Sequence, residues 1–314
     1  MSDDLPIIDA HHHFWDPVSN NHPWLSKRPL IPFRYGDYSA ICRPFLADDY
    51  DRVSAGHNVI GSITMEGEWD PADPIGETAW IDKLSAGSGR PLAHVAHADL
   101  RSKDIDTVLA RLARFPIVRS IRQKPAATPD PRSFQQGRPG SMSDPAWQRG
   151  FARLAAHGLM FDLQVPWWHL IEAIGIAERY PDVPIILNHT GLPADRSAEG
   201  LAGWRSALRD FARVPHVAIK ISGLGLRGRP WRLEDNRPII LDAIDMFGPE
   251  RCMFASNFPV DGLCGSFDTI FRGFKEATRG FDRREREAMF AGNAARIYRV
   301  ACQIERMSAM RRRT

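Results

Sequence analysis

The stretch IIDAHHHFWDP, Ile7–Pro17, places three consecutive histidines at the end of an apolar run that is typical of a β-strand. Side chains two residues apart in a strand share one face, so Asp9, His11 and His13 are expected to point the same way. His12 is expected to point the opposite way, toward surrounding helices or solvent. Two histidines that face inward together from a strand end indicate a catalytic or ligand-binding role for His11 and His13.

Seven further short apolar runs follow this one along the chain. Residues 104–115 and 201–211, which lie between runs, repeat apolar side chains at the i, i+3, i+4, i+7 spacing of an amphipathic helix. Strands that alternate with helices predict right-handed βαβ units and a parallel sheet, and eight units predict a (β/α)8 TIM barrel. No glycine-rich dinucleotide fingerprint favours an open Rossmann sheet. The expected strands are PIIDAH (6–11), NVIGSITM (58–65), LAHVAHA (92–98), IVRSIRQ (117–123), LMFDLQV (159–165), PIILNHT (184–190), HVAIKIS (216–222) and RCMFASN (251–257).

Two connections are longer than ordinary loops. Residues 17–48 are rich in Trp, Pro and Arg, and residues 125–144 are rich in Pro, Gly and Ser. We expect both to cover the C-terminal mouth of the barrel, where the active sites of such barrels lie. Residues 1–302 are expected to form one domain, and residues 303–314 a basic, frayed tail.

The composition argues against several classes of partner. A net charge of +3 on 314 residues gives no basic surface for a nucleic acid. The four cysteines are scattered without a Cys-x-x-Cys pair, as in a reduced cytoplasmic protein, and the N-terminus has no signal-peptide pattern. No apolar run approaches the ~20 residues that cross a bilayer. We therefore expect a cytoplasmic enzyme with a small-molecule substrate, and leave open whether it forms a homo-oligomer.

Polar residues gather where the expected strands end. As structural groups, Arg122 and Lys220 would need carboxylate partners, because an unpaired buried charge is costly. Asp9, Glu66 and Asp162 are candidates for that role. As functional groups, the same two cations would face the mouth of the barrel. The strand-end residues are His11, His13, Glu66, Arg122, Asp162, Gln164, His189, Lys220, Ser222 and Asn257, with Asp261 shortly beyond.

This pattern resembles the amidohydrolase superfamily, which carries His-x-His at the end of its first strand and a histidine on its sixth. Within the superfamily, the chain is most similar to the amidohydrolase-related branch that includes 2-pyrone-4,6-dicarboxylate lactonase and L-fuconolactonase. The phrases that carry the resemblance extend from residue 9 to residue 299: DAHHHFWDP, VRSIRQ, FDLQV, ILNHTGLP, VAIKISGL, CMFASNFPVD and GNAARIYR.

The chain departs from the pattern of that superfamily at three strand ends. Two-metal members use a lysine or glutamate on the fourth strand and a histidine on the fifth, where this chain has Arg122 and Gln164. A guanidinium has no lone pair to give a cation, so the resemblance implies at most one metal. The eighth strand ends in Asn257, where the family has an aspartate that accepts a proton from the attacking water. An amide cannot act as a general base near pH 7.

Two arrangements remain open for His11, His13 and His189. The three imidazoles could hold one Zn²⁺ with an open position for water. Alternatively they could donate hydrogen bonds to the developing oxyanion without a metal, as the resemblance to the lactonase implies.

The other roles follow from the same comparison. Arg122 and Lys220 would hold a carboxylate or sugar oxygens of the substrate. Asp261 is the expected general base in place of Asn257, with Asp162 and His189 as alternatives. The remaining substrate-binding residues are expected to be Glu66, Gln164 and Trp15.

The resemblance implies a hydrolase that opens the ester of a small sugar-acid or aromatic-catabolite lactone. One alternative is decarboxylation of an aromatic acid, which related branches perform with one metal. A second alternative is a barrel that binds a small molecule without turnover, and the amide at position 257 is the reason to consider it.

Overall fold

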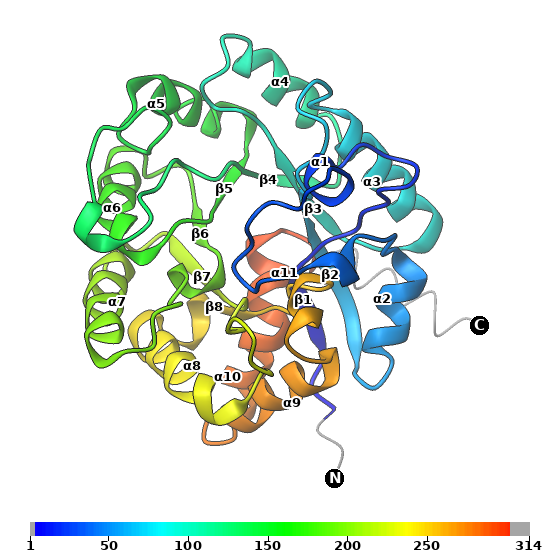
Figure 1. Ribbon diagram of the computed structural model, residues 1–314, viewed down its shortest axis with the longest axis vertical. Helices are drawn as coiled ribbons and strands as arrows, with labels where there is room; N and C mark the ends of the chain where they lie inside the picture. Colours follow the sequence, from blue (N-terminus) through cyan, green and yellow to red (C-terminus); the bar gives the residue numbers. More distant parts are fainter. Residues whose placement is uncertain (1–3, 302–314) are drawn as a thin grey trace.

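The computed structural model describes residues 4–301, in which eight parallel strands form one sheet in the order of the chain (Figure 1). Each strand hydrogen-bonds to the next, and helices alternate with the strands around the outside. This architecture confirms the predicted (β/α)8 barrel. The strands are β1 (Ile7–His12), β2 (Val59–Met65), β3 (Ala93–His97), β4 (Val118–Arg122), β5 (Met160–Leu163), β6 (Ile185–Leu187), β7 (Val217–Ile221) and β8 (Cys252–Phe254).

The helices that follow the strands surround the barrel in Figure 1. The two amphipathic patterns in the sequence correspond to α4 and α7. Within residues 4–301, no helix is both long enough and apolar enough to span a bilayer. The helices are α1 (Pro23–Ser26), α2 (Ala47–Ser54), α3 (Gly76–Ser88), α4 (Ile105–Leu112), α5 (Pro145–Phe151), α6 (Leu170–Arg179), α7 (Ala198–Ala212), α8 (Leu233–Phe247), α9 (Phe267–Ala277), α10 (Arg283–Glu287) and α11 (Asn293–Ile297).

Two apolar cores lie on the two faces of the strands. The larger core fills the space between the strands and the helices, as the alternation of side chains along a strand requires. The smaller core fills the interior of the barrel, with Ile8, Met65, Ile186 and Met253 among its members, and Tyr298 joins it from the end of the described chain. The interior is therefore a packed core, as in other barrels of this type.

Strand β1 contains a β-bulge that changes the direction of its side chains. Asp9 lies opposite Ser62 and His12 opposite Thr64, so three steps along β1 match two steps along β2. A bulge of this kind breaks the simple alternation of faces. His11 consequently faces the barrel interior although Asp9 does not, and the prediction that these two side chains share a face is wrong.

Asp9 instead lies on the helix side of the barrel. Its Oδ2 accepts a hydrogen bond from the Tyr50 hydroxyl at 2.9 Å, and its Oδ1 accepts one from the Ser256 N–H at 2.8 Å. His12 also faces outward, with its ring 4.4 Å from that of Tyr50, as predicted. Asp9 thus connects β1 to the segment after β8 and is not available as a partner for the interior cations.

The same two segments meet again at the mouth of the barrel. The His13 N–H donates to the Phe258 carbonyl at 2.7 Å, and the Asn257 N–H donates to the His11 carbonyl at 2.8 Å. The first and last strands of the barrel are therefore joined by the backbone of three of the predicted site residues.

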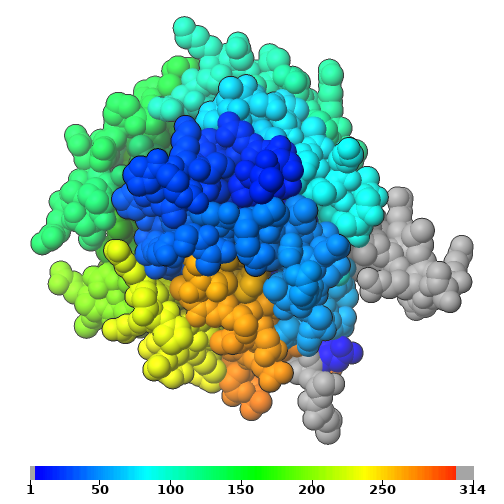
Figure 2. All heavy atoms as spheres, turned by 45° about the vertical axis from the view of Figure 1, so that its right-hand side comes forward, coloured from blue at the N-terminus to red at the C-terminus, as the bar shows by residue number. Residues whose placement is uncertain are grey.

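The two long loops have different positions. Residues 17–48 extend across the barrel axis in Figure 1 and spread over one face of the molecule in Figure 2, both in blue. They contribute Trp24 and residues 31–34 to a cavity at the mouth, as predicted. Residues 125–144 line no part of that cavity, because the Thr128 N–H is held by Nε2 of His169, at the start of α6, at 2.9 Å. That this second loop covers the mouth stays a prediction. The predicted tail, residues 303–314, lies outside the described residues.

Candidate active site

A cavity of about 250 Å³ opens at the C-terminal ends of the strands, beneath the loop of residues 17–48. Its volume lies just below the range of about 300–1,000 Å³ that is usual for ligand pockets, which suits a small substrate. Sequence reasoning did not single out Glu68, Lys124 or Val260, which also line it. The predicted site residues that line it are His13, Trp15, Glu66, Arg122, Gln164, His189 and Asn257.

Three histidines converge at the ends of β1 and β6, as predicted: His13 and His189 line the cavity, and His11 is buried beside them. The ring centroid of His11 lies 4.4 Å from that of His189 and 5.2 Å from that of His13. Burial lowers the pKa of all three well below the usual value, and nearby cations, among them Arg122 beside His13 and Arg34 beside His189, lower it further. The three imidazoles are therefore neutral at pH 7.

Hydrogen bonds indicate the tautomer of His13. Its Nδ1 lies 3.2 Å from the Met65 carbonyl oxygen, which can only accept, so Nδ1 carries the proton. Nε2 then presents a lone pair and cannot donate to an oxyanion, contrary to the role expected for this residue. Trp15, which is fully buried, stacks against the ring at a centroid distance of 5.6 Å and keeps it in place.

His189 has a partner that can either donate or accept. Its Nδ1 lies 2.9 Å from the Ser222 hydroxyl oxygen, so either tautomer is compatible with this contact. Gly223 packs against the same ring, and a Cβ at this position would come within 2.6 Å of it. A glycine after β7 is thus required for the close approach that positions His189.

Several residues at the mouth adopt a strained backbone. His189 and Asn257 have φ angles of 55° and 54°, and Glu68 has a φ of 57°. The left-handed region is uncommon for residues other than glycine, and such strain concentrates at functional sites. All three of these residues line the cavity.

Arg122, at the end of β4, is held by residues at the ends of β2 and β5. Its Nε donates to Oε1 of Glu66 at 2.6 Å, its Nη2 to the Glu66 carbonyl at 2.6 Å, and its Nη1 to Oε1 of Gln164 at 3.0 Å. Burial acts to raise the pKa of Glu66, but the guanidinium outweighs it and holds that pKa well below its usual range. Glu66 and Gln164 therefore fix the orientation of Arg122, which still has N–H groups to offer to a ligand.

The structure does not support the expected substrate-binding role of Lys220. Its Nζ lies 2.6 Å from Oδ1 of Asp162, and both side chains are fully buried inside the barrel. The Tyr298 hydroxyl donates to the same carboxylate at 2.8 Å. Because this group lies within the core, Asp162 is also not placed to act as a general base.

Asp261 is likewise withdrawn from the cavity. Oδ1 of Asp261 accepts hydrogen bonds from Nδ2 of Asn257 at 2.6 Å and from the Tyr35 hydroxyl at 2.9 Å, and Nη2 of Arg34 lies 3.7 Å away. Burial raises the pKa of this carboxyl, and the neighbouring donors act against that rise. Asp261 does not line the cavity, so the structure does not support its expected role as the base. It orients the amide of Asn257, which does line it.

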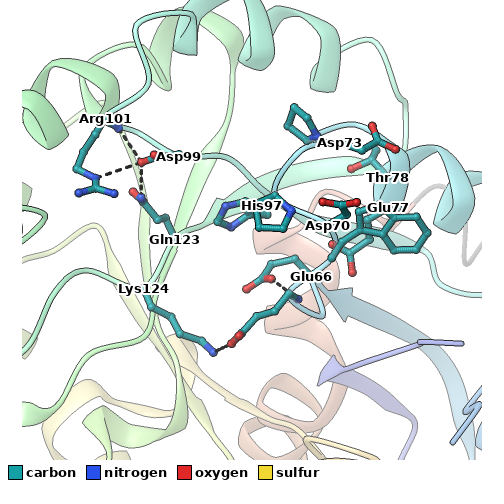
Figure 3. Close-up of a pocket in the computed structure, with 14 residues that line it drawn as sticks. Glu66, Asp70, Asp73, Glu77, Thr78, His97, Asp99, Arg101, Gln123 and Lys124 are labelled. Atoms are coloured by element: carbon teal, nitrogen blue, oxygen red, sulfur yellow. Dashed lines mark hydrogen bonds and ion pairs between the residues drawn. The ribbon is translucent and has the colours of Figure 1, made fainter. Parts of the chain in front are cut away.

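A second, larger cavity of about 470 Å³ lies beside the first, over the ends of β2, β3 and β4 (Figure 3). It shares Glu66, Glu68 and Lys124 with the histidine cavity. An ion pair between Lys124 and Glu68 lies at this boundary. The lining of the second cavity is strongly acidic, and Asp70, Asp73 and Glu77 contribute to it.

Three neighbouring imidazoles are candidate ligands for one divalent metal. Both ring nitrogens of His11 are buried without a hydrogen-bond partner, and imidazole is a suitable donor for zinc. However, within residues 4–301 no three His, Cys, Asp or Glu side chains are grouped so that they could hold an ion. At the end of β8, where a carboxylate could act as a further metal ligand, the chain has the amide of Asn257. The arrangement of the described residues therefore does not fit a bound divalent metal.

Comparisons with known proteins agree with this architecture. The chain is 40% identical to an uncharacterized protein of Sinorhizobium fredii over 95% of this chain and 99% of that one. It is 30% identical to an L-fucono-1,5-lactonase of Burkholderia multivorans, over 93% of this chain and 95% of that one. A crystal structure of an amidohydrolase from B. multivorans with bound zinc superposes with a TM-score of 0.75 at 28% identity, and covers 93% of this chain and 99% of that one.

The match to a protein family covers nearly the whole barrel. The family described as Amidohydrolase matches residues 8–300, from β1 to the end of α11 and beyond. This range includes the converging histidines and every residue that lines the cavity. The chain belongs to the amidohydrolase family.

Proposed function

We propose that this protein hydrolyses the ester bond of a small lactone of the sugar-acid class. The observation that carries the proposal is the convergence of neutral His11, His13 and His189 at a cavity of about 250 Å³ beside a fixed arginine. The name of the Burkholderia relative, L-fucono-1,5-lactonase, supports the substrate class.

In this proposal, His13 accepts the proton of the attacking water. Its Nε2 has a lone pair because Nδ1–H is bonded to the Met65 carbonyl, and the residue lines the cavity. A positioned neutral base of this kind contributes about 10²- to 10⁴-fold to the rate. The water oxygen bonds to the carbonyl carbon of the lactone. His13 then returns the proton to the ring oxygen as the C–O bond breaks, so the product is an open-chain hydroxy acid.

The negative charge that develops on the carbonyl oxygen needs donors that are already in place. Arg122 supplies them, because Glu66 and Gln164 hold its guanidinium rigidly while two of its N–H bonds remain free. His189 adds a second donor when the Ser222 hydroxyl donates to Nδ1 and leaves the proton on Nε2.

The loop of residues 17–48 limits the size of the substrate and the access of bulk water. Trp24 and Phe33 stack at a centroid distance of 5.9 Å above the cavity and form part of its apolar wall. A low-polarity wall strengthens the hydrogen bonds formed beneath it.

Neither alternative reading gains support from the described residues. Decarboxylation in related proteins needs a firmly held cation, and the described side chains are not grouped to hold one. A barrel that only binds its ligand needs no base, whereas here a neutral imidazole with a defined tautomer lines the cavity.

The test is a hydrolysis assay with a panel of five- and six-membered sugar-acid lactones and aromatic lactones, followed by a pH indicator and corrected for spontaneous opening. Metal content is measured on the same sample before and after treatment with a chelator. Catalysed opening of at least one lactone that is lost in a His13→Ala variant supports the proposal. No catalysed opening across the panel would contradict it.

A further inference from the structure

A third cavity, of about 280 Å³, lies next to the histidine cavity on the side of β6 and β7. Arg34 lines both cavities, so the two are separated by this side chain. The third cavity also contains Arg196, from the loop after β6, and Arg227, from the loop after β7. We call these three residues and the space between them the arginine pocket.

The lining of the arginine pocket is positively charged. Among the described residues, no Asp or Glu lines it. Asp261 lies behind Arg34, 3.7 Å from its Nη2, and therefore compensates only one of the three cations. Tyr35, Trp168 and Leu226 form apolar walls around the guanidinium groups. Such walls exclude water and strengthen the attraction for an anion.

Arg196 has hydrogen-bond donors that the protein does not use. Its Nη2 donates to the Leu224 carbonyl and to Oδ1 of Asn236, each at 3.3 Å. Its Nε and Nη1 are buried and have no partner among the described residues. Buried donors without an acceptor destabilise a protein, so this group indicates a missing acceptor.

Arg227 is exposed and is placed against the early loop. Its Nε lies 3.6 Å from the position that a Cβ on Gly36 would occupy, and Gly36 has a φ of +94° that favours glycine. The loop that covers the active site and the loop after β7 therefore meet at the arginine pocket.

The opposite side of the histidine cavity carries the opposite charge. The acidic cavity in Figure 3, with the carboxylates of Asp70 and Asp73, lies over β2 to β4. A substrate with one anionic end is repelled from that side and attracted toward Arg34, so the field would orient it in the cavity between.

We propose that the arginine pocket binds a carboxylate or phosphate carried on an arm of the lactone substrate. The inference rests on the proposed lactonase activity and narrows it to acidic lactones. Guanidinium groups bind both anions through paired, charge-assisted hydrogen bonds, so the shared chemistry is an oxyanion. The lactone ring lies at the histidines, and the anionic arm passes Arg34.

The experiment compares three lactones of one sugar framework: D-glucono-1,5-lactone, its 6-phosphate, and a D-glucaro-lactone that carries a carboxylate. We measure kcat/KM for each in wild type, Arg196→Gln and Arg227→Gln. The ratio for acidic over neutral lactone is expected to exceed one and to fall about tenfold in each variant, the loss typical of one charge-assisted hydrogen bond. Arg229→Gln is the control, because Arg229 lies in the same exposed loop but does not line the pocket.

The two acidic substrates identify which oxyanion is preferred. An equal ratio in wild type and both variants overturns the arginine pocket and leaves the lactonase intact.

If no lactone is opened, the proposed function fails, and calorimetric titration with inorganic phosphate and with citrate tests the pocket by itself. Binding that weakens in Arg227→Gln but not in Arg229→Gln supports it, and equal binding in the two variants overturns it. Arg227 is exposed, so its replacement is not expected to impair folding.

Discussion

Asn257 donates its Nδ2–H to Oδ1 of Asp261 at 2.6 Å, so the amide at the end of β8 is held by a carboxylate buried behind it. Asn257 itself lines the histidine cavity, whereas Asp261 does not. The carboxylate that the family places at this strand end is absent, but a carboxylate four residues later fixes the group that replaces it.

We predict that Asn257→Asp lowers both stability and turnover at pH 7. The change places two carboxylates in contact without water, which costs about 1–3 kcal/mol. The double variant Asn257→Asp/Asp261→Asn restores an amide–carboxylate pair and should recover most of the loss in urea denaturation. A single Asn257→Asp variant that is as stable as wild type and more active would contradict this account of the pair.

The histidine cluster predicts a contrast between adjacent residues. His11→Ala, His13→Ala and His189→Ala are each expected to lower kcat/KM at least 10²-fold, because each removes an imidazole from the base of the cavity. His12→Phe is the matched control. His12 packs against Phe14 and Tyr50 on the helix side, and its ring nitrogens have no partner among the described residues. A loss of activity in His12→Phe as large as in His13→Ala would contradict the assignment of the active site to the other three histidines.

The buried imidazoles also predict how the protein responds to pH. Burial and neighbouring cations lower the pKa of His11, His13 and His189 well below 6.5, so kcat/KM should not decline as the pH falls from 8 through 6.5. The unfolded chain, in contrast, binds protons at its histidines near pH 6.5.

Stability should therefore decrease as the pH falls below 6.5. The slope is up to about 1.4 kcal/mol per pH unit for each buried histidine, since the unfolded state then binds more protons than the folded state. Burial lowers the pKa of His12 to about 3, so His12→Phe should reduce this slope without moving the activity profile. Urea denaturation at pH 5 to 8, with rate measurements in the same buffers, checks both statements. An activity profile with a midpoint near 6.5 would show that the catalytic imidazoles are not shielded as described.

Lys220 and Asp162 are predicted to act on stability rather than on substrate binding. Lys220→Met leaves Asp162 buried without its cation, which typically costs 3–5 kcal/mol. Lys220→Met/Asp162→Asn removes both charges, keeps an acceptor for the Tyr298 hydroxyl and should recover most of that stability. KM should stay within about twofold of wild type in the double variant. A tenfold rise in KM would show that Lys220 takes part in substrate binding.

The order of strands and the meeting of the histidines could be predicted from the sequence, because both depend on local patterns. The apolar runs have the length of strands, and strand ends in a parallel barrel all meet at one mouth. The direction of Asp9 could not be predicted, since the bulge in β1 depends on its register against Ser62 and Thr64 in β2. The register between two strands cannot be read from the sequence.

The partners of the charged residues could not be predicted from the sequence either. Lys220 and Arg122 occur in similar strand patterns, yet Arg122 reaches the cavity and Lys220 lies inside the core. The difference arises from depth along the barrel axis, which depends on strand tilt and on the layer of side chains above. The partner of Asp261 could not be predicted for a similar reason. Its position four residues after Asn257 does not reveal that its carboxylate points back toward that residue.

Tyr298, whose hydroxyl reaches the carboxylate of Asp162, follows all eight strands along the chain. During synthesis, the strands that carry Asp162 and Lys220 leave the ribosome long before the residue that covers them. The buried ion pair of Asp162 and Lys220 therefore lacks this hydroxyl donor in the nascent barrel until the segment after β8 has emerged.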